Sequence, residues 1–235
     1  MEAIVLAGGL GTRLKSTIGN YPKCMAPVNG IPFLDYLFHY LQSENIERAI
    51  LSLGYEHQII LDWLMTQQLS FAIDNVIEYE PLGTGGGIQL AMQKVKDDNV
   101  IVLNGDTLFQ VPLQEQLTFH EKCGAATTLA LKEIRQFDRY GAVNIDANNC
   151  ITSFSEKKYN DVGLINGGIY VINKKAFLAK NLPEKFSFEK DYLEVFVNEK
   201  AFYGYKSNAY FIDIGIPEDY EKAKQDFEVL YKSKL

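Results

Sequence analysis

Cysteine is scarce in this sequence, and its placement excludes two kinds of cross-linked fold. The 235 residues contain three cysteines, Cys24, Cys123 and Cys150. They lie far apart, their number is odd, and none belongs to a CxxC or Cys/His ligand pattern. This argues against a disulfide framework and against a zinc site. We therefore expect reduced thiols and a cytoplasmic protein.

Long apolar runs are also missing. No stretch approaches the roughly 18–20 apolar residues that a transmembrane helix needs, and the N-terminal segment lacks the basic and apolar regions of a secretory signal. The formal net charge is −7, and acidic and basic residues are mixed along the chain. Proteins that bind nucleic acids or membranes usually carry a basic face, so we expect neither partner. A small anionic substrate is not excluded, because a few local cations are enough to bind it.

Three familiar catalytic patterns are absent as well. The chain has no GxxxxGK[ST] phosphate loop and no GxSxG nucleophile elbow. The histidines His39, His57 and His120 do not fall into a pattern that suggests a triad. We expect them to be structural or exposed.

The first half of the chain alternates two hydrophobic patterns. Apolar runs typical of buried strands occur at 2–7, 49–53, 75–79 and 99–104, and segments at 33–44, 57–67 and 85–95 have helical spacing. This alternation predicts βαβ units and an α/β fold whose mainly parallel sheet is covered on both faces. The second half has strand-like segments at 126–134, 140–146, 150–156, 163–173 and 210–215 with little helix between them, followed by a closing helix from Pro217. We expect a mixed or antiparallel lobe at the edge of the sheet.

The glycine-rich loop at 5–14, VLAGGLGTRL, follows the first strand. Gly9 and Gly11 give GxG, but Leu14 breaks the GxGxxG dinucleotide fingerprint. Alone, such a loop is compatible with a tight turn, and Arg13 and Lys23 with solvated surface charges. Two cations close to glycine-rich backbone N–H groups suit a triphosphate, whose charge must be neutralised during phosphoryl-type transfer.

Two aspartates stand at the ends of predicted strands. Asp106 in LNGDT follows an apolar strand, and Asp213 ends the strand YFIDIG. The carboxyl ends of strands in α/β sheets face the ligand crevice, and Mg²⁺ prefers one or two carboxylates together with phosphate oxygens. The pair therefore predicts a magnesium site, with turn or capping aspartates as the alternative.

Further small polar segments are ambiguous when each is taken alone. The glycines of EPLGTGGGIQLA at 80–91 suit either a close backbone approach to a ligand or a flexible helix entry. DRYGAV, SEKK and NGGIY in the second half suit either a sugar site, which needs carboxylates, amides and an aromatic wall, or ordinary hairpin turns.

As an ordered set, these segments resemble the sugar-phosphate nucleotidyltransferases. The set is LAGGxGTRL, PK, EPLGT, NGD, YG, EK, NGGIY and DIGxP, and it extends over nearly the whole chain. The resemblance implies an enzyme with a Rossmann-like nucleotide-binding core and a sugar-binding lobe. It implies a single nucleotidyltransferase domain over 1–235, with the core at about 1–110 and the lobe and closing helix at about 111–235. Its reaction joins a nucleoside triphosphate to a sugar 1-phosphate with Mg²⁺ and releases pyrophosphate.

EPLGTGG and the strings at 137–146, 165–170, 186–193 and 210–220 are most similar to guanylyltransferases. They imply GTP and a D-glycero-α-D-manno-heptose 1-phosphate, with mannose 1-phosphate or another nucleotide (UTP, CTP or dTTP) as alternatives.

The resemblance also implies roles for individual residues. Arg13, Lys23 and Asp106 would be catalytic, and Asp106 and Asp213 would bind the metal. The nucleotide would contact Leu6, Ala7, Gly8, Gly9, Gly11, Thr12, Arg13, Glu80, Gly83 and Thr84. The sugar phosphate would contact Asn104, Gly105, Tyr140, Gly141, Glu156, Lys157, Asn166 and Gly167.

One segment departs from the family pattern. The spacer LKSTIGNYPK lacks the further proline that the family often has before Pro-Lys. This departure affects the expected path of the loop, whereas the Arg13/Lys23 pair is kept. A non-catalytic regulatory relative would be expected to lose one of the charged residues, and an NAD-type oxidoreductase would need the missing fingerprint. An exposed apolar edge would support a homo-oligomer.

Overall fold

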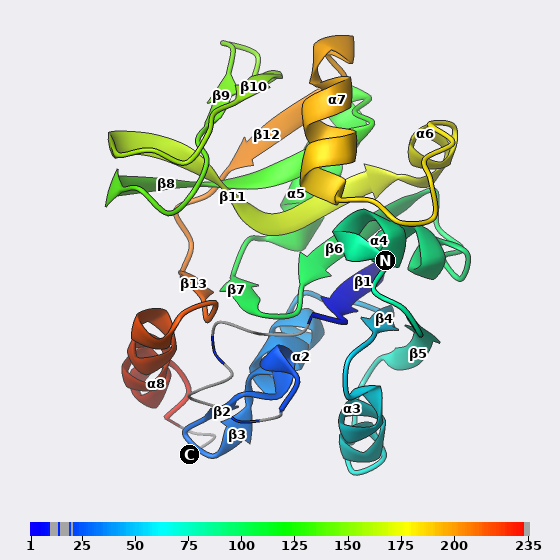
Figure 1. Cartoon of the computed structure of the whole chain (residues 1–235), viewed down its shortest axis with the longest axis vertical. Helices are drawn as coiled ribbons and strands as arrows, with labels where there is room; N and C mark the ends of the chain where they lie inside the picture. Colours follow the sequence, from blue (N-terminus) through cyan, green and yellow to red (C-terminus); the bar gives the residue numbers. More distant parts are fainter. Residues whose placement is uncertain (10–13, 15–18, 20, 233–235) are drawn as a thin grey trace.

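A computed structural model gives the structure of the protein and describes residues 1–9, 14, 19 and 21–232. Its main element is a seven-stranded mixed sheet that crosses the molecule (Figure 1). β1, β4, β5 and β6 are mutually parallel, β11 pairs antiparallel with β6, β8 pairs antiparallel with β11, and β12 pairs parallel with β8. In spatial order the strands are β12 (Phe202–Lys206), β8 (Thr127–Phe137), β11 (Asn160–Asn173), β6 (Asn99–Asn104), β1 (Glu2–Ala7), β4 (Arg48–Leu53) and β5 (Ala72–Ile77).

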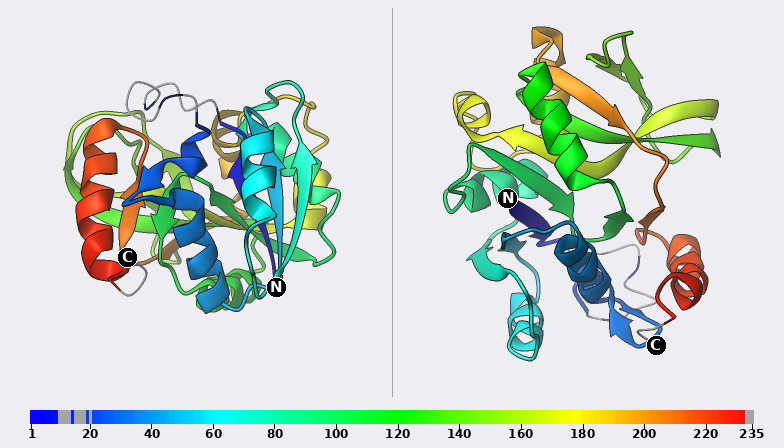
Figure 2. Two further views of the ribbon diagram at one scale, coloured as in Figure 1. Left: turned by 90° about the horizontal axis from the view of Figure 1, so that it is seen from below. Right: turned by 180° about the vertical axis from the view of Figure 1, so that it is seen from behind.

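Helices bury both faces of this sheet. Alternate side chains of β1 enter two different cores, because successive residues of a strand point to opposite faces. Ala3 and Val5 join the core formed with α2 (Phe33–Ser43), α3 (His57–Leu64), α5 (Leu113–Cys123) and α8 (Pro217–Leu230). Ile4 joins the core formed with α4 (Gly83–Met92), α6 (Lys174–Leu178) and the helical segment η2–α7–η3 (Phe188–Leu193, Glu194–Phe196, Val197–Glu199). The view from behind in Figure 2 shows α2 and α5 on the same side of the sheet.

Short elements complete the chain around the site. They are η1 (Lys23–Met25), the pair β2 (Pro27–Val28) and β3 (Ile31–Pro32), the pair β7 (Thr107–Phe109) and β13 (Phe211–Asp213), and the pair β9 (Val143–Ile145) and β10 (Ile151–Phe154). The β7–β13 pairing opposes Thr107 to Asp213. It therefore brings the end of β13 beside Asp106, although the two aspartates are far apart in sequence.

β11 contains a bulge where it pairs with β8. Between Asn166 and Tyr170 it advances four residues, while its partner β8 advances two, from Leu131 to Leu129. Gly168 has φ +73° in this bulge, a backbone conformation that glycine adopts without a steric penalty. The bulge contains the glycines of NGGIY and turns them away from the regular ladder.

The expected α/β class is confirmed, with differences in detail. The four parallel strands of the first half form as predicted, although β5 spans Ala72–Ile77 instead of 75–79. In the second half, β11, β8 and β12 continue the main sheet beyond β6 as a mixed extension of its edge, whereas β9 pairs with β10 and β13 pairs with β7 in separate two-stranded sheets. α5 and the helical segment 188–199 were not expected from the hydrophobic pattern. No helix among the described residues is long and apolar enough to cross a membrane.

Candidate functional site

A cavity of about 580 Å³ lies at the carboxyl ends of the parallel strands. β1, β4, β5 and β6 each end at this edge, and the residues that follow them supply its wall. Ligands of open α/β sheets bind at this edge. The lining includes Leu6, Ala7, Gly8, Gly9, Gly54, Tyr55, Glu78, Gly83, Thr84 and Gly105. We call this space the nucleotide cavity.

A second cavity, of about 700 Å³, lies on the side of β11 and β13. It is lined by the bulge of β11, by the turn that precedes β9 and by the segment after β13. Its side chains include Arg139, Tyr140, Lys157, Asn166, Tyr170, Glu189, Asp213 and Asp219. Amide, carboxylate, phenol and cationic groups are the partners that sugar hydroxyls and a phosphate need. We call this space the sugar cavity.

The two cavities meet at one place. Lys23, Asn104 and Asp106 line both of them. Asn104 ends β6 and Asp106 follows it, so the end of a single strand separates the two spaces. A group that is transferred between a ligand in one cavity and a ligand in the other would pass at these three residues.

The junction holds a compact charged cluster. Lys23 Nζ donates a hydrogen bond to Asp106 Oδ2 and lies 3.6 Å from Asp213 Oδ1. Burial raises the pKa of Asp213, and the charge of Asp106 raises it further. Lys23 and the Gly215 N–H, which donates to Asp213 Oδ1 at 2.8 Å, act in the opposite direction. The cluster therefore favours an additional positive charge near Asp213.

The donor set at the junction fits a divalent cation that is shared with phosphate. Asp106 and Asp213 supply two carboxylates, and no group of three His, Cys, Asp or Glu side chains suited to a metal occurs in the described part of the chain. Mg²⁺ is usually held by one or two carboxylates plus substrate phosphates, whereas zinc and calcium sites need more protein ligands. The two half-buried, mutually repelling carboxylates fit the first arrangement.

Most of the expected site residues lie at the two cavities, and some do not. Gly11, Thr12 and Arg13 are outside the described residues. Glu80 is exposed and is absent from the lining of either cavity, as are Gly141 and Glu156. Gly105 lines the nucleotide cavity instead of the sugar cavity, and its N–H donates to Leu6 O at 2.9 Å. A Cβ on Gly141 would lie 2.6 Å from Ser155 O, so this glycine allows close packing of two chain segments.

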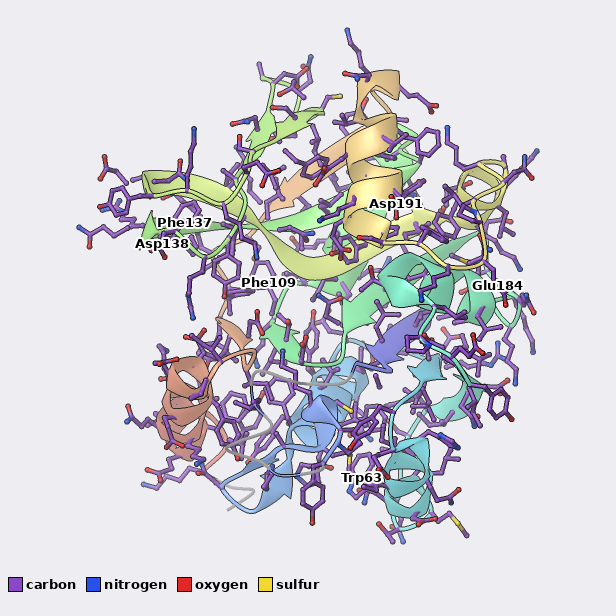
Figure 3. The ribbon with its side chains drawn as sticks, viewed as in Figure 1. Trp63, Phe109, Phe137, Asp138, Glu184 and Asp191 are labelled. Carbon is purple, nitrogen blue, oxygen red and sulfur yellow. The ribbon has the colours of Figure 1, made fainter. Side chains whose placement is uncertain are left out.

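Three glycines of the EPLGTGGG segment make room for the chain itself. A Cβ on Gly83, Gly85 or Gly86 would collide with residues 184–186. Phe186 O accepts from Gly85 N at 3.1 Å, and Phe186 N donates to Leu82 O at 3.0 Å. Figure 3 shows Glu184 in the loop beside α4. The glycines thus let the 184–188 segment pack tightly onto the start of α4, and we call this contact the clamp. This role differs from both a ligand approach and a flexible helix entry.

The chain with this two-cavity arrangement is similar to proteins of a known family. Residues 2–229 match the family model described as nucleotidyl transferase. The chain belongs to this family. The D-glycero-α-D-manno-heptose 1-phosphate guanylyltransferase of Aneurinibacillus thermoaerophilus is 48% identical over 97% of this chain and 99% of its own length. The enzyme of the same name from Campylobacter jejuni is 46% identical over 94% of this chain and 97% of its own length.

A solved structure extends the similarity to three dimensions. The crystal structure of HddC from Yersinia pseudotuberculosis complexed with GMP-PN matches this nucleotidyltransferase with a TM-score of 0.85 at 38% identity. The match covers 96% of this chain and 99% of that one. The expected family and fold are thereby confirmed over almost the whole length.

Two carboxylates of this nucleotidyltransferase escaped the reasoning from sequence. Glu78 directly follows β5 and lines the nucleotide cavity, and its position at the carboxyl end of a parallel strand was the available signal. Its Oε1 accepts from Ser52 Oγ at 2.9 Å and its Oε2 from Leu82 N at 3.2 Å. Glu189, at the start of η2, lines the sugar cavity. No local pattern marked it, because its segment reaches the site only through packing on α4.

Proposed function

We propose that the protein transfers a guanylyl group from GTP to D-glycero-α-D-manno-heptose 1-phosphate and releases pyrophosphate. The observation that carries this proposal is the meeting of the two cavities at Lys23, Asn104 and Asp106. GTP occupies the nucleotide cavity and the sugar phosphate occupies the sugar cavity. An oxygen of the sugar phosphate attacks the α-phosphorus of GTP, the bond from that phosphorus to the bridging β-phosphate oxygen breaks, and pyrophosphate leaves in line.

Catalysis consists of alignment and charge neutralisation. The attacking phosphate oxygen is already anionic, so the reaction needs no general base. Lys23 stands at the junction and neutralises charge on the phosphates. Tyr140, whose pKa burial raises to about 12, stays a neutral hydrogen-bonding phenol in the sugar cavity, where Lys157 supplies a further cation. From the family motif, we assign Arg13 to the triphosphate and the leaving pyrophosphate.

Glu78 supports guanine as the base. An ionised carboxylate only accepts hydrogen bonds, and its two oxygens offer about four lone-pair sites. Ser52 and Leu82 use two of them and hold the group in place, which leaves capacity for the adjacent N–H donors of guanine. The names of the two relatives and of the GMP-PN complex point to the same nucleotide class.

Magnesium is the cation we propose for the junction, held by Asp106 and Asp213 together with phosphate oxygens. When bound there, it supplies positive charge that stabilises the charge developing on the transferred phosphate. We further propose that residues 1–235 act as one nucleotidyltransferase domain, with a core at about 1–110 and a sugar-phosphate lobe at about 111–235. The unpaired thiols Cys24, Cys123 and Cys150 support a cytoplasmic enzyme.

The direct test is pyrophosphate release with each of the four nucleoside triphosphates against a panel of sugar 1-phosphates. We expect GTP with the heptose 1-phosphate to give the highest kcat/KM. A preference for mannose 1-phosphate would move the sugar assignment and leave the reaction class intact. Release from no combination would contradict the proposal.

The same assay tests the residue roles. Asp106→Ala, and Arg13→Ala from the sequence motif, should lower kcat by about 10²–10³, the loss typical of one electrostatic contact in the transition state. Asp161→Ala changes an exposed aspartate and is the control. Wild-type turnover in both site variants would refute the assigned roles.

A further inference from the structure

We infer that Glu189 is a sugar-contacting residue of this enzyme, and that Thr84 in the nucleotide cavity is the positioning residue that orients it. This inference rests on the proposed function and names the contact that the sugar part of the substrate makes. Glu189 lines the sugar cavity and Thr84 lines the nucleotide cavity. The hydrogen bond between their side chains therefore connects the two binding spaces.

One oxygen of Glu189 is fixed by the protein. Oε2 accepts from Thr84 Oγ1 at 2.8 Å and from Ser187 Oγ at 3.0 Å. Within the described residues, Oε1 accepts no hydrogen bond. The carboxylate is thus held in a single orientation by one of its oxygens, and the other is available to a ligand in the cavity that Glu189 lines.

The Thr84 hydroxyl uses its only proton in this arrangement. Its oxygen accepts from Phe188 N at 2.9 Å, and its single proton goes to Glu189 Oε2. The side chain therefore has no donor left for a nucleotide, and Thr84 lines the nucleotide cavity from the first turn of α4. A nucleotide packed against this turn would hold Thr84, and with it Glu189, in place.

Glu189 is suited to contact the sugar part of the substrate and not its phosphate. A carboxylate accepts hydrogen bonds from hydroxyl groups and repels a phosphate dianion. The cations of the sugar cavity, Lys23, Lys157 and Arg139, suit the phosphate. Glu189 lies beside Tyr170, whose pKa is raised by burial and then by the Glu189 charge. Tyr170 Oη accepts from Asn166 Nδ2 at 2.8 Å, so the three side chains form one polar wall.

The test uses Glu189→Gln, which keeps the shape and removes the charge. Dissociation constants for heptose 1-phosphate and mannose 1-phosphate are measured by calorimetry in the presence of a non-hydrolysable GTP analogue. If Glu189 accepted no hydrogen bond from the sugar, loss of a negative charge would tighten the binding of these dianions. We expect the opposite: binding weakens about tenfold, as for loss of a hydrogen bond to a charged acceptor, while inorganic phosphate is bound no more weakly.

Thr84→Val tests the positioning role and Thr84→Ser is its rescue control. Thr84→Val should weaken sugar phosphate binding severalfold, Thr84→Ser should restore it, and Thr84→Val/Glu189→Gln should be no weaker than Glu189→Gln alone. Glu194→Gln, an exposed change on the same helical segment, should have no effect. Thermal unfolding midpoints verify that each variant is folded.

Each outcome is decisive. Unchanged or tighter sugar phosphate binding by Glu189→Gln overturns the role of Glu189, and strictly additive effects in the double variant overturn the role of Thr84. If the wild type binds sugar phosphates but releases no pyrophosphate, the reaction assignment fails while the binding comparison still stands. If it binds none of them, both proposals fail.

Discussion

At the scale of single residues, the junction depends on three charges that come from distant parts of the chain. η1 supplies Lys23, the end of β6 supplies Asp106 and the end of β13 supplies Asp213. The lysine partly offsets the repulsion between two carboxylates, and Asp213 still has a raised pKa. The ionised form of Asp213 therefore lowers the stability of the folded protein, and the fold tolerates this at the site.

Asp213→Asn should therefore separate stability from activity. The variant should lose about 10²–10³ in kcat, because it lacks one of the two carboxylates at the junction. It should also unfold at a higher temperature at pH 7.5, because the folded state disfavours the charge that is removed. Since the pKa of Asp213 is raised on folding, the wild type regains this stability as the pH falls through that pKa, and the difference between the proteins should shrink toward pH 4.

Differential scanning fluorimetry across this pH range measures the effect, with the exposed change Asp161→Asn as control. A lower melting temperature for Asp213→Asn at pH 7.5 would show that pairing with Lys23 outweighs burial.

The sequence predicted the three charged residues because each stands beside a strand end or a proline-marked turn within an ordered set of motifs. It did not predict Glu189, since that side chain enters the site only after 184–188 has packed on α4. Glu80 is the opposite case, because the motif pointed to it and it lines neither cavity. Two glutamates lie two positions apart after β5, and only the folded backbone shows that Glu78 lines the cavity.

At the scale of elements, the clamp between α4 and residues 184–188 holds the chain directly before Glu189, which lines the sugar cavity. A Cβ on Gly85 would overlap the ring of Phe186, which is buried in the second core. The clamp also fixes where η2 begins, because Ser187 caps it by accepting from Lys190 N at 3.2 Å. Packing here therefore sets the position of the first turn of η2.

Gly85→Ala should displace Phe186 and destabilise the protein by about 1–3 kcal/mol, the usual range for an overpacked core position. KM for the sugar 1-phosphate should rise more than KM for GTP, because the displaced segment leads directly into Glu189, which lines the sugar cavity. Urea unfolding and steady-state kinetics measure the two effects. Adding Phe186→Leu should recover part of the stability, and a double variant as unstable as the summed single changes would show that the ring is not the obstacle.

The pattern of elements was predictable where periodicity is strong. β1, α2, β4 and β6 have continuous apolar runs or a clear apolar stripe. α5 was missed because its sequence, LQEQLTFHEKC, is mostly polar, although Pro112 before it and Gly124 in the left-handed conformation after it are typical helix boundaries. The segment 188–199 was missed because it combines π-helical, α-helical and 3₁₀ turns without a single period.

At the scale of the whole molecule, one buried histidine joins the parallel and antiparallel parts of the sheet. His120 on α5 hydrogen-bonds with Thr128 Oγ1 of β8 at 3.0 Å and with Asn99 Oδ1 of β6 at 3.3 Å. Burial lowers its pKa to about 4. It serves the structure, as the sequence suggested for the histidines, and it makes the fold sensitive to pH.

The free energy of unfolding should fall as the pH drops from about 6.5 toward 4. The folded state lowers the pKa of His120, so the imidazole binds a proton more tightly in the unfolded chain. The stability that the neutral imidazole contributes is therefore complete above the unfolded pKa and is lost as the pH falls toward the folded pKa. The full loss is on the order of 3 kcal/mol. His120→Gln should flatten this decline, whereas the exposed His39→Gln should not. Denaturant unfolding at pH 7, 5.5 and 4.5 checks this, and an equally steep decline in His120→Gln would contradict it.

The bulge in β11 also indicates how the sugar cavity can change during evolution. Three residues of β11, from Gly167 to Ile169, stand opposite Ala130 alone, so the strand holds two more residues than its partner over this stretch. Side chains alternate with a period of two, and an excess of two leaves every inward and outward position of the flanking ladders as it was. Gain or loss of a residue pair at this point would change the lining of the sugar cavity and keep the inward and outward alternation of the flanking ladders. New sugar preferences are therefore open to this fold through small length changes in a strand, and not only through substitutions.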